Sequence, residues 1–199
     1  TRRGVFGKPE RLGEDGCYHY SMRLIISAAA DVPVGGHSPK SAGSVFDAKD
    51  IVIGDRAAPL TIVEYASVTC PHCAAVNEQI MPSIKEKFID TGKVKLVFRE
   101  FPTAPANYAI IGSLLARCAA EKAGPDAYFL ITDALFRQQQ AWVSKDARAE
   151  LIKIVAQAGM DEAALDACVK REDLQKIIND NATTALEKHQ VNGTPTFFL

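Results

Sequence analysis

The chain has 199 residues, of which 47% are hydrophobic, and a formal net charge of −1 at pH 7. This length and apolar content suffice for one sizeable hydrophobic core, with some chain left over. The charge balance argues against a nucleic-acid-binding surface, and no apolar run suggests a membrane segment.

The first 49 residues contain scattered Gly, Pro, Ser and charged residues without a sustained hydrophobic period, which predicts a flexible leader, 1–49, ahead of a folded domain, 50–199. Thr1-Arg2-Arg3-Gly4 resembles the start of a twin-arginine export signal, but a polar stretch follows it. Residues 22–30 end in small residues after a short apolar core. Neither stretch has the full pattern, so we expect no clear signal peptide here.

The folded part begins with alternating strand and helix patterns. Residues 50–54 predict a short edge strand, and the β-branched run 60–66 predicts a buried strand. Apolar residues then recur at three- and four-residue spacing, which predicts one helix that continues to about Asp90. Residues 93–101 alternate as a second core strand, so the expected order is strand, helix, strand.

Two cysteines, Cys70 and Cys73, lie where the first buried strand passes into that helix. The first turn of a helix has unpaired N–H groups and a partial positive charge, which stabilise an anion such as a thiolate. An imidazolium at His72 would stabilise it further. We therefore expect Cys70 to have a low pKa and to be a good leaving group in disulfide exchange.

From about residue 105 to 190 the sequence favours helices throughout, which is too much helix for a simple crossover between strands. We expect a helical subdomain inserted into an α/β scaffold. A final strand should follow a Gly-Thr-Pro turn, with Pro195 at its start and a cis bond at this tight entry. The predicted helices are 107–123, 126–139, 146–158, 161–170 and 171–189.

The chain contains five cysteines, so at least one thiol is left over if the others pair. Cys17 lies alone in the polar leader. Cys118 and Cys168 each fall on the apolar face of a predicted helix, where they could meet or remain two separate buried thiols. The pattern alone leaves both possibilities open.

At this point several residues resemble one family. Cys70-Pro71-His72-Cys73 follows a strand that contains Glu64, a helical region comes next, and Thr194-Pro195 opens a late strand. This combination resembles the DsbA-type thiol-disulfide oxidoreductases of the thioredoxin superfamily, from about residue 50 to 199. The resemblance implies an α/β, thioredoxin-like fold with a helical insertion at about 105–190, and a chain truncated before the last strand and C-terminal helix.

The resemblance also implies roles for the residues around the two sulfurs. Cys70 would be the exposed nucleophile in the Cys70-Pro71-His72-Cys73 motif, Cys73 its buried partner, and His72 a residue that tunes the thiolate. Glu64 would help to move a proton to or from Cys73. These residues are the catalytic set that we expect.

The late strand and the helical insertion carry the remaining implied roles. Pro195 would be cis and lie beside the sulfurs, and Thr194 would offer its backbone to an extended substrate segment. The similarity to a branch with a second disulfide favours a structural bond between Cys118 and Cys168. No metal, no organic cofactor and no nucleic acid would be involved.

By this resemblance the protein is a periplasmic monomer that donates the Cys70–Cys73 disulfide to unfolded or partly folded exported proteins with free thiols. A DsbB-like membrane protein would re-oxidise it. One alternative is a reductase or isomerase of the same fold. Another is a non-catalytic fragment in which the two cysteines bind zinc or brace the fold, although zinc would need about two more ligands.

For some of these residues a simpler structural role is possible. Glu64 could be a strand residue on a solvated face, without a role in catalysis. Trp142, Phe197 and Phe198 are expected to serve packing.

Overall fold

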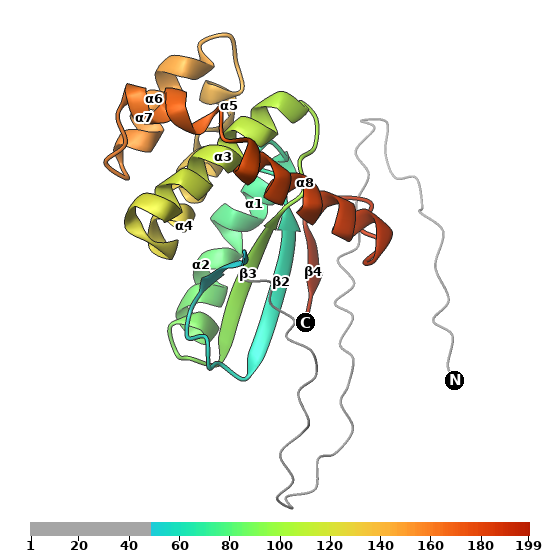
Figure 1. The fold of residues 1–199 in the computed structure, drawn as a ribbon. Helices are drawn as coiled ribbons and strands as arrows, with labels where there is room; N and C mark the ends of the chain where they lie inside the picture. Colours follow the sequence, from blue (N-terminus) through green and yellow to red (C-terminus); the bar gives the residue numbers. More distant parts are fainter. Residues whose placement is uncertain (1–48) are drawn as a thin grey trace, which may run out of the picture.

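The computed structural model describes residues 49–199, so Cys17, the export-signal stretches and nearly all of the predicted leader 1–49 lie outside the described residues. Within that range, four strands form one sheet in the order β1-β3-β2-β4 (Figure 1). Strands β2 and β3 run parallel, while β1 and β4 pair antiparallel at the two edges. The strands are β1 (Ile51–Ile53), β2 (Leu60–Ala66), β3 (Val94–Glu100) and β4 (Thr196–Phe198).

Side chains alternate between the two faces of this sheet, because successive residues of a strand point in opposite directions. Val63, Tyr65 and Val97 pack on one face, against Ala185 of helix α8 (Glu172–Glu187). Leu96 and Phe98 lie on the other face, which helices cover as well. Both faces of the central strands are thus buried, as expected for a parallel pair.

The helix after β2 is not continuous to Asp90, so this part of the prediction is wrong. It consists of α1 (Pro71–Gln79), α2 (Met81–Ile84) and the wider turns of η1 (Lys85–Ile89). The break falls at Ile80, whose φ of −111° departs from helical geometry. Pro82 has no N–H with which to continue the hydrogen-bond pattern of α1, so a new segment starts beside it.

A helical insertion separates β3 from the last strand, as the sequence predicted (Figure 1). The predicted helix over 126–139 ends earlier, at Arg137, and a short separate helix follows it. Among the described residues, no helix combines the length and apolar character that a membrane crossing requires. The helices before α8 are α3 (Ala106–Ala123), α4 (Pro125–Arg137), α5 (Gln139–Trp142), α6 (Ala147–Ala156) and α7 (Glu162–Cys168).

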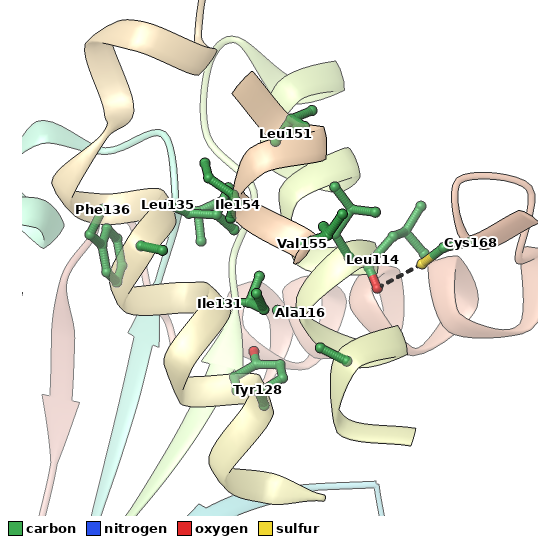
Figure 2. Packing of buried hydrophobic residues seen from close by; sticks show 14 of the residues in the cluster. Leu114, Ala116, Tyr128, Ile131, Leu135, Phe136, Leu151, Ile154, Val155 and Cys168 are labelled. Atoms are coloured by element: carbon green, nitrogen blue, oxygen red, sulfur yellow. Dashed lines mark hydrogen bonds between the residues drawn. The ribbon is translucent and has the colours of Figure 1, made fainter. Parts of the chain in front are cut away.

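The inserted helices share one apolar core with the start of α1. Figure 2 shows Ile131 and Leu135 of α4 facing Ile154 and Val155 of α6, with Leu114 of α3 beside them. Trp142 is fully buried in the same core, so this residue serves packing. The core also contains Cys73, and it therefore joins the insertion to the region of the paired cysteines.

A buried carboxylate ties the insertion to the sheet. Glu100, at the end of β3, is 1% exposed and pairs with Arg117 of α3, with Nε 2.7 Å from Oε1. Tyr128 of α4 and Asn181 of α8 donate hydrogen bonds to the same carboxylate at 2.8 and 2.7 Å. Because a buried charge is costly unless it is fully paired, these contacts constrain how three helices sit on the strand.

Cys118 of α3 and Cys168 at the end of α7 form a disulfide. Cys168 Sγ also lies 3.1 Å from the carbonyl oxygen of Leu114 (Figure 2). The bond joins residues 50 positions apart, so it restricts a long loop of the unfolded chain.

We expect the double variant Cys118→Ala/Cys168→Ala to be less stable by about 4 kcal/mol, the loop-entropy value for a closure of this length. The measurement is the free energy of unfolding in urea, compared with that of the unsubstituted protein under oxidising conditions. Disulfide exchange at Cys70 should remain. A loss of stability well under about 1 kcal/mol would mean that the bond braces little.

Candidate active site

The two free cysteines of the described chain lie at the start of α1. Cys70 is the residue directly before the helix, with extended backbone angles, and its carbonyl accepts the amide of Ala74 at 3.1 Å. Pro71 occupies the first helical position, where a missing N–H costs nothing. Cys70 is 8% exposed and is therefore itself buried, so the expectation of an exposed nucleophile is wrong. Cys73 is buried completely.

The surroundings of Cys70 favour its thiolate. A hydrogen bond from the Cys73 side chain is the main cause that lowers the pKa of Cys70 to about 5, against the opposing effect of burial. The Thr194 side chain and the amides of Cys73 and His72 lower the pKa of Cys70 further. At neutral pH Cys70 is therefore mostly ionised.

The surroundings of Cys73 have the opposite effect. Burial raises the pKa of Cys73 far above its ordinary value, and both the hydrogen bond to Cys70 and the negative charge of the Cys70 thiolate raise it further. In the reduced pair one sulfur is an anion and the other keeps its proton. The two sulfurs thus differ in charge although they are one helical turn apart.

His72 is exposed at the start of α1. Its backbone amide is among the groups that stabilise the Cys70 thiolate. This contribution comes from the position of the residue at the helix start, and the amide of any residue at this position would supply it.

The turn before β4 brings distant residues to the same place. Cys70 Sγ lies 3.4 Å from the carbonyl oxygen of Thr194, across 124 positions of sequence. The Thr194-Pro195 bond is cis, and both residues are partly exposed. A backbone segment that is accessible to solvent thus lies directly beside the reactive sulfur.

Glu64 lies in the middle of β2, 4% exposed, so the alternative of a solvated strand face is wrong. It pairs in register with Phe98 of β3, and residues in register point to the same face of a sheet. Phe98 belongs to the apolar core that contains Cys73. Burial raises the pKa of Glu64 to about 8, so the carboxyl is largely protonated at pH 7.

Gln139, at the start of α5, is a site residue that the sequence interpretation missed. Its side-chain amide donates to the carbonyl oxygens of Val68 at 2.8 Å and Cys70 at 3.0 Å. These bonds hold the loop that carries Cys70 against the helical insertion. A glutamine at the start of a short helix has no distinctive sequence pattern, so the sequence did not indicate its role.

We expect Gln139→Ala to destabilise the protein by about 1 to 2 kcal/mol, because two carbonyl groups lose their donor. Gln140→Ala is a matched control, since the adjacent Gln140 is exposed. Urea unfolding of both variants measures the effect. Equal stabilities would show that the two bonds to the loop contribute nothing.

The zinc alternative lacks ligands in this geometry. Cys118 and Cys168 are the other cysteines of the part of the chain that the structure describes, and they are bonded to each other. Within residues 49–199, no three or more His, Cys, Asp or Glu side chains gather where they could hold a metal ion. The donor set around Cys70 and Cys73 is thus two sulfurs without further metal ligands.

Comparisons with known proteins agree on this fold. A family model described as thioredoxin matches residues 47–199. A Rickettsia bellii protein, provisionally named a protein-disulfide oxidoreductase, is 31% identical over 155 residues, which are 77% of this chain and 58% of that protein. Disulfide bond formation protein D of Bacillus subtilis is 30% identical over 155 residues, 74% of this chain and 66% of that protein.

Solved structures give the same result. The crystal structure of Wolbachia pipientis alpha-DsbA1 superposes with a TM-score of 0.69 at 30% identity, covering 76% of this chain and 74% of that one. A protein-disulfide isomerase from Novosphingobium aromaticivorans superposes with a TM-score of 0.63 at 25% identity, covering 75% and 85%. The chain spans a little over half the length of the Rickettsia relatives that it matches.

Proposed function

The chain belongs to the thioredoxin family, in its DsbA-type branch, and from this we propose that it is a thiol-disulfide oxidoreductase that donates the Cys70–Cys73 disulfide to other proteins. The observation that carries the proposal is the difference between the two sulfurs. Cys70 is ionised with a pKa of about 5, whereas burial keeps Cys73 protonated. A stable Cys70 thiolate favours the reduced pair, so the oxidised pair gives its disulfide away readily.

The reaction needs two exchanges. A substrate thiolate attacks Cys70 Sγ of the oxidised pair, a new bond joins the two proteins, and the Cys70–Cys73 bond breaks with its electrons on Cys73. A second substrate thiolate then attacks the substrate sulfur of this mixed disulfide, and Cys70 leaves as a thiolate. The substrate gains one disulfide, the pair gains two electrons, and low basicity makes Cys70 the better leaving group.

Glu64 supplies the proton that the first exchange requires. Cys73 leaves as a thiolate in a buried site, where its charge is costly. The Glu64 carboxyl lies on the face of the sheet that packs against the core containing Cys73. It is protonated at pH 7, since its pKa is about 8. Proton transfer from Glu64 to Cys73 neutralises the sulfur, and it makes the first exchange favourable.

The substrates are unfolded or partly folded exported proteins with free thiols, and Thr194 binds them through its backbone. Strand addition beside Pro195 would hold an extended segment across Cys70 without requiring a specific sequence. The protein works as a periplasmic monomer and is re-oxidised by a DsbB-like membrane protein. His72 and Pro71 complete the motif at the start of α1.

Two measurements test this function. Oxidised protein should restore activity to a reduced, unfolded test enzyme that has several thiols, with one disulfide transferred per molecule of protein. The redox potential, measured by equilibration with glutathione, should lie well above about −240 mV, the range of the cytosolic glutathione pool. A potential at or below that range would favour a reductase and would contradict disulfide donation.

A further inference from the structure

A cavity of about 370 Å³ lies between the sheet and the helices that cover the Glu64 face. Strands β1, β2 and β3 form one wall of the cavity. The other walls come from the segment α1 to η1 and from α4, and these helices lie on one side of the sheet in Figure 1. Most of the lining is apolar, and three phenylalanine rings contribute to it. The main apolar lining residues are Ile89, Leu96, Phe98, Phe129 and Phe136.

Two buried polar groups also line the cavity. Thr132 of α4 is 3% exposed, and its Oγ1 has no hydrogen-bond partner among the described residues. Glu64 is 4% exposed, and burial raises the pKa of its carboxyl. A buried polar atom without a partner costs about 1 to 3 kcal/mol, so a ligand that satisfies both groups would gain binding energy.

The other polar groups of the lining already have partners. Asn77 donates to Asp133 at 2.7 Å, and Arg137 pairs with the second oxygen of that carboxylate at 2.8 Å. Lys85 pairs with Asp90 outside the cavity. This leaves Glu64 and Thr132 as the groups that could recognise a molecule inside.

We propose that this cavity binds a small, uncharged aromatic molecule that carries one hydroxyl group. The three phenylalanine rings favour an aromatic body, and a volume of this size lies within the range of small-molecule sites. The hydroxyl group would exchange hydrogen bonds with the Glu64 carboxyl and Thr132 Oγ1. A charged molecule is disfavoured, because the apolar walls would have to desolvate it.

Apart from Glu64, Thr132 and polar groups that already have partners, the lining offers water no hydrogen bonds. An apolar body with a single polar group matches the lining better, and the site contains none of the residues that contact Cys70 at the surface.

The test uses 1-naphthol as the probe and the oxidised protein, so binding is measured without turnover and independently of the proposed redox reaction. In methyl NMR spectra, a saturable titration should shift the resonances of Ile53, Ile89 and Leu96, all of which line the cavity. The anion 1-naphthoate should shift them much less. No saturable shift, or shifts confined to residues around Pro195, would overturn the proposal.

A substitution isolates the polar contact. Thr132→Val keeps the shape of the side chain and removes the hydroxyl, so the affinity for 1-naphthol should fall about tenfold. Thr183→Val, at an exposed position of α8, is the matched control and should bind as the unsubstituted protein does. Equal affinities for the two variants would contradict the role of Thr132, and the methyl shifts of the unsubstituted protein decide the site even if Thr132→Val does not fold.

Discussion

Cys70→Ser should reduce disulfide donation to the uncatalysed background, because a serine hydroxyl is not ionised at neutral pH and cannot form a disulfide. The substrate thiolate bonds to Cys70 Sγ in the first exchange, and the low pKa of about 5 makes Cys70 the better leaving group in the second. The measurement is the rate at which a reduced, multi-thiol test protein regains activity. Retention of a substantial rate would show that another cysteine performs the exchange.

Cys73→Ser should lose turnover too, but with a different product. Cys70 remains reactive in this variant, and nothing inside the protein can displace a substrate from it. With a protein that already contains a disulfide, the Cys70 thiolate should attack one sulfur and release the other as a thiolate. The resulting disulfide-bonded complex should accumulate and be visible on a non-reducing gel, and Cys70→Ser should give none. Complexes formed equally by both variants would contradict the assignment of Cys70 as the nucleophile.

Glu64→Gln should be more stable than the unsubstituted protein, by a margin that grows as pH rises. The pKa of Glu64 is about 8 in the folded chain against an ordinary value of 4.5, so the folded state holds the proton more tightly. The unsubstituted protein therefore loses stability as pH increases from about 4.5 to 8, because its buried carboxyl must ionise. Each pKa unit corresponds to 1.36 kcal/mol, so the penalty reaches about 3 kcal/mol at pH 7 and about 5 kcal/mol above pH 8.

The same substitution should slow the reaction. An amide cannot donate a proton to Cys73, and loss of a general acid commonly costs about 10²-fold or more in rate. Urea unfolding at several pH values and single-turnover exchange with a small thiol measure the two effects. Glu187→Gln, at an exposed position near the end of α8, is the control and should change neither. A Glu64→Gln variant that is less stable at pH 8 would contradict the account of burial.

The strands and most helices could be predicted because the local sequence decides them. The β-branched run of β2 predicts a strand whose second half is fully buried. The alternating pattern of β3 predicts the strand, although nearly all of its residues are buried. The junction of strand and helix at Cys70 follows from the same patterns. Local preference was therefore sufficient to place the two sulfurs at a helix start.

Other features depend on contacts between distant residues, which no local pattern contains. The sequence around Glu64 would be the same whether its side chain were solvated or buried. Only the pairing of β2 with β3 and the apolar core packed on that face determine that it is buried. Gln139 contacts the Cys70 loop across 69 positions of sequence. The break at Ile80 lies within an apolar period that continues on both sides. That period predicts one continuous helix, although Pro82 interrupts the hydrogen-bond pattern.

Stabilisation of the Cys70 thiolate is the central claim, and it has a definite pH dependence. The pKa of Cys70 in the folded, reduced protein lies below that of a free thiol, so the added stability of the reduced form is fully present above the free-thiol pKa. It is lost as pH falls through about 5. At pH 7 the thiolate contributes about 3 kcal/mol relative to pH 5, from two pKa units.

The most direct measurement is therefore the ultraviolet absorbance of the thiolate in the reduced protein as a function of pH, with Cys70→Ser as the control. We predict one transition with a midpoint near 5 that is absent from the control. A midpoint near 9, the ordinary value for a cysteine thiol, would contradict the account, because the reduced pair would then have no stabilised anion to favour disulfide donation.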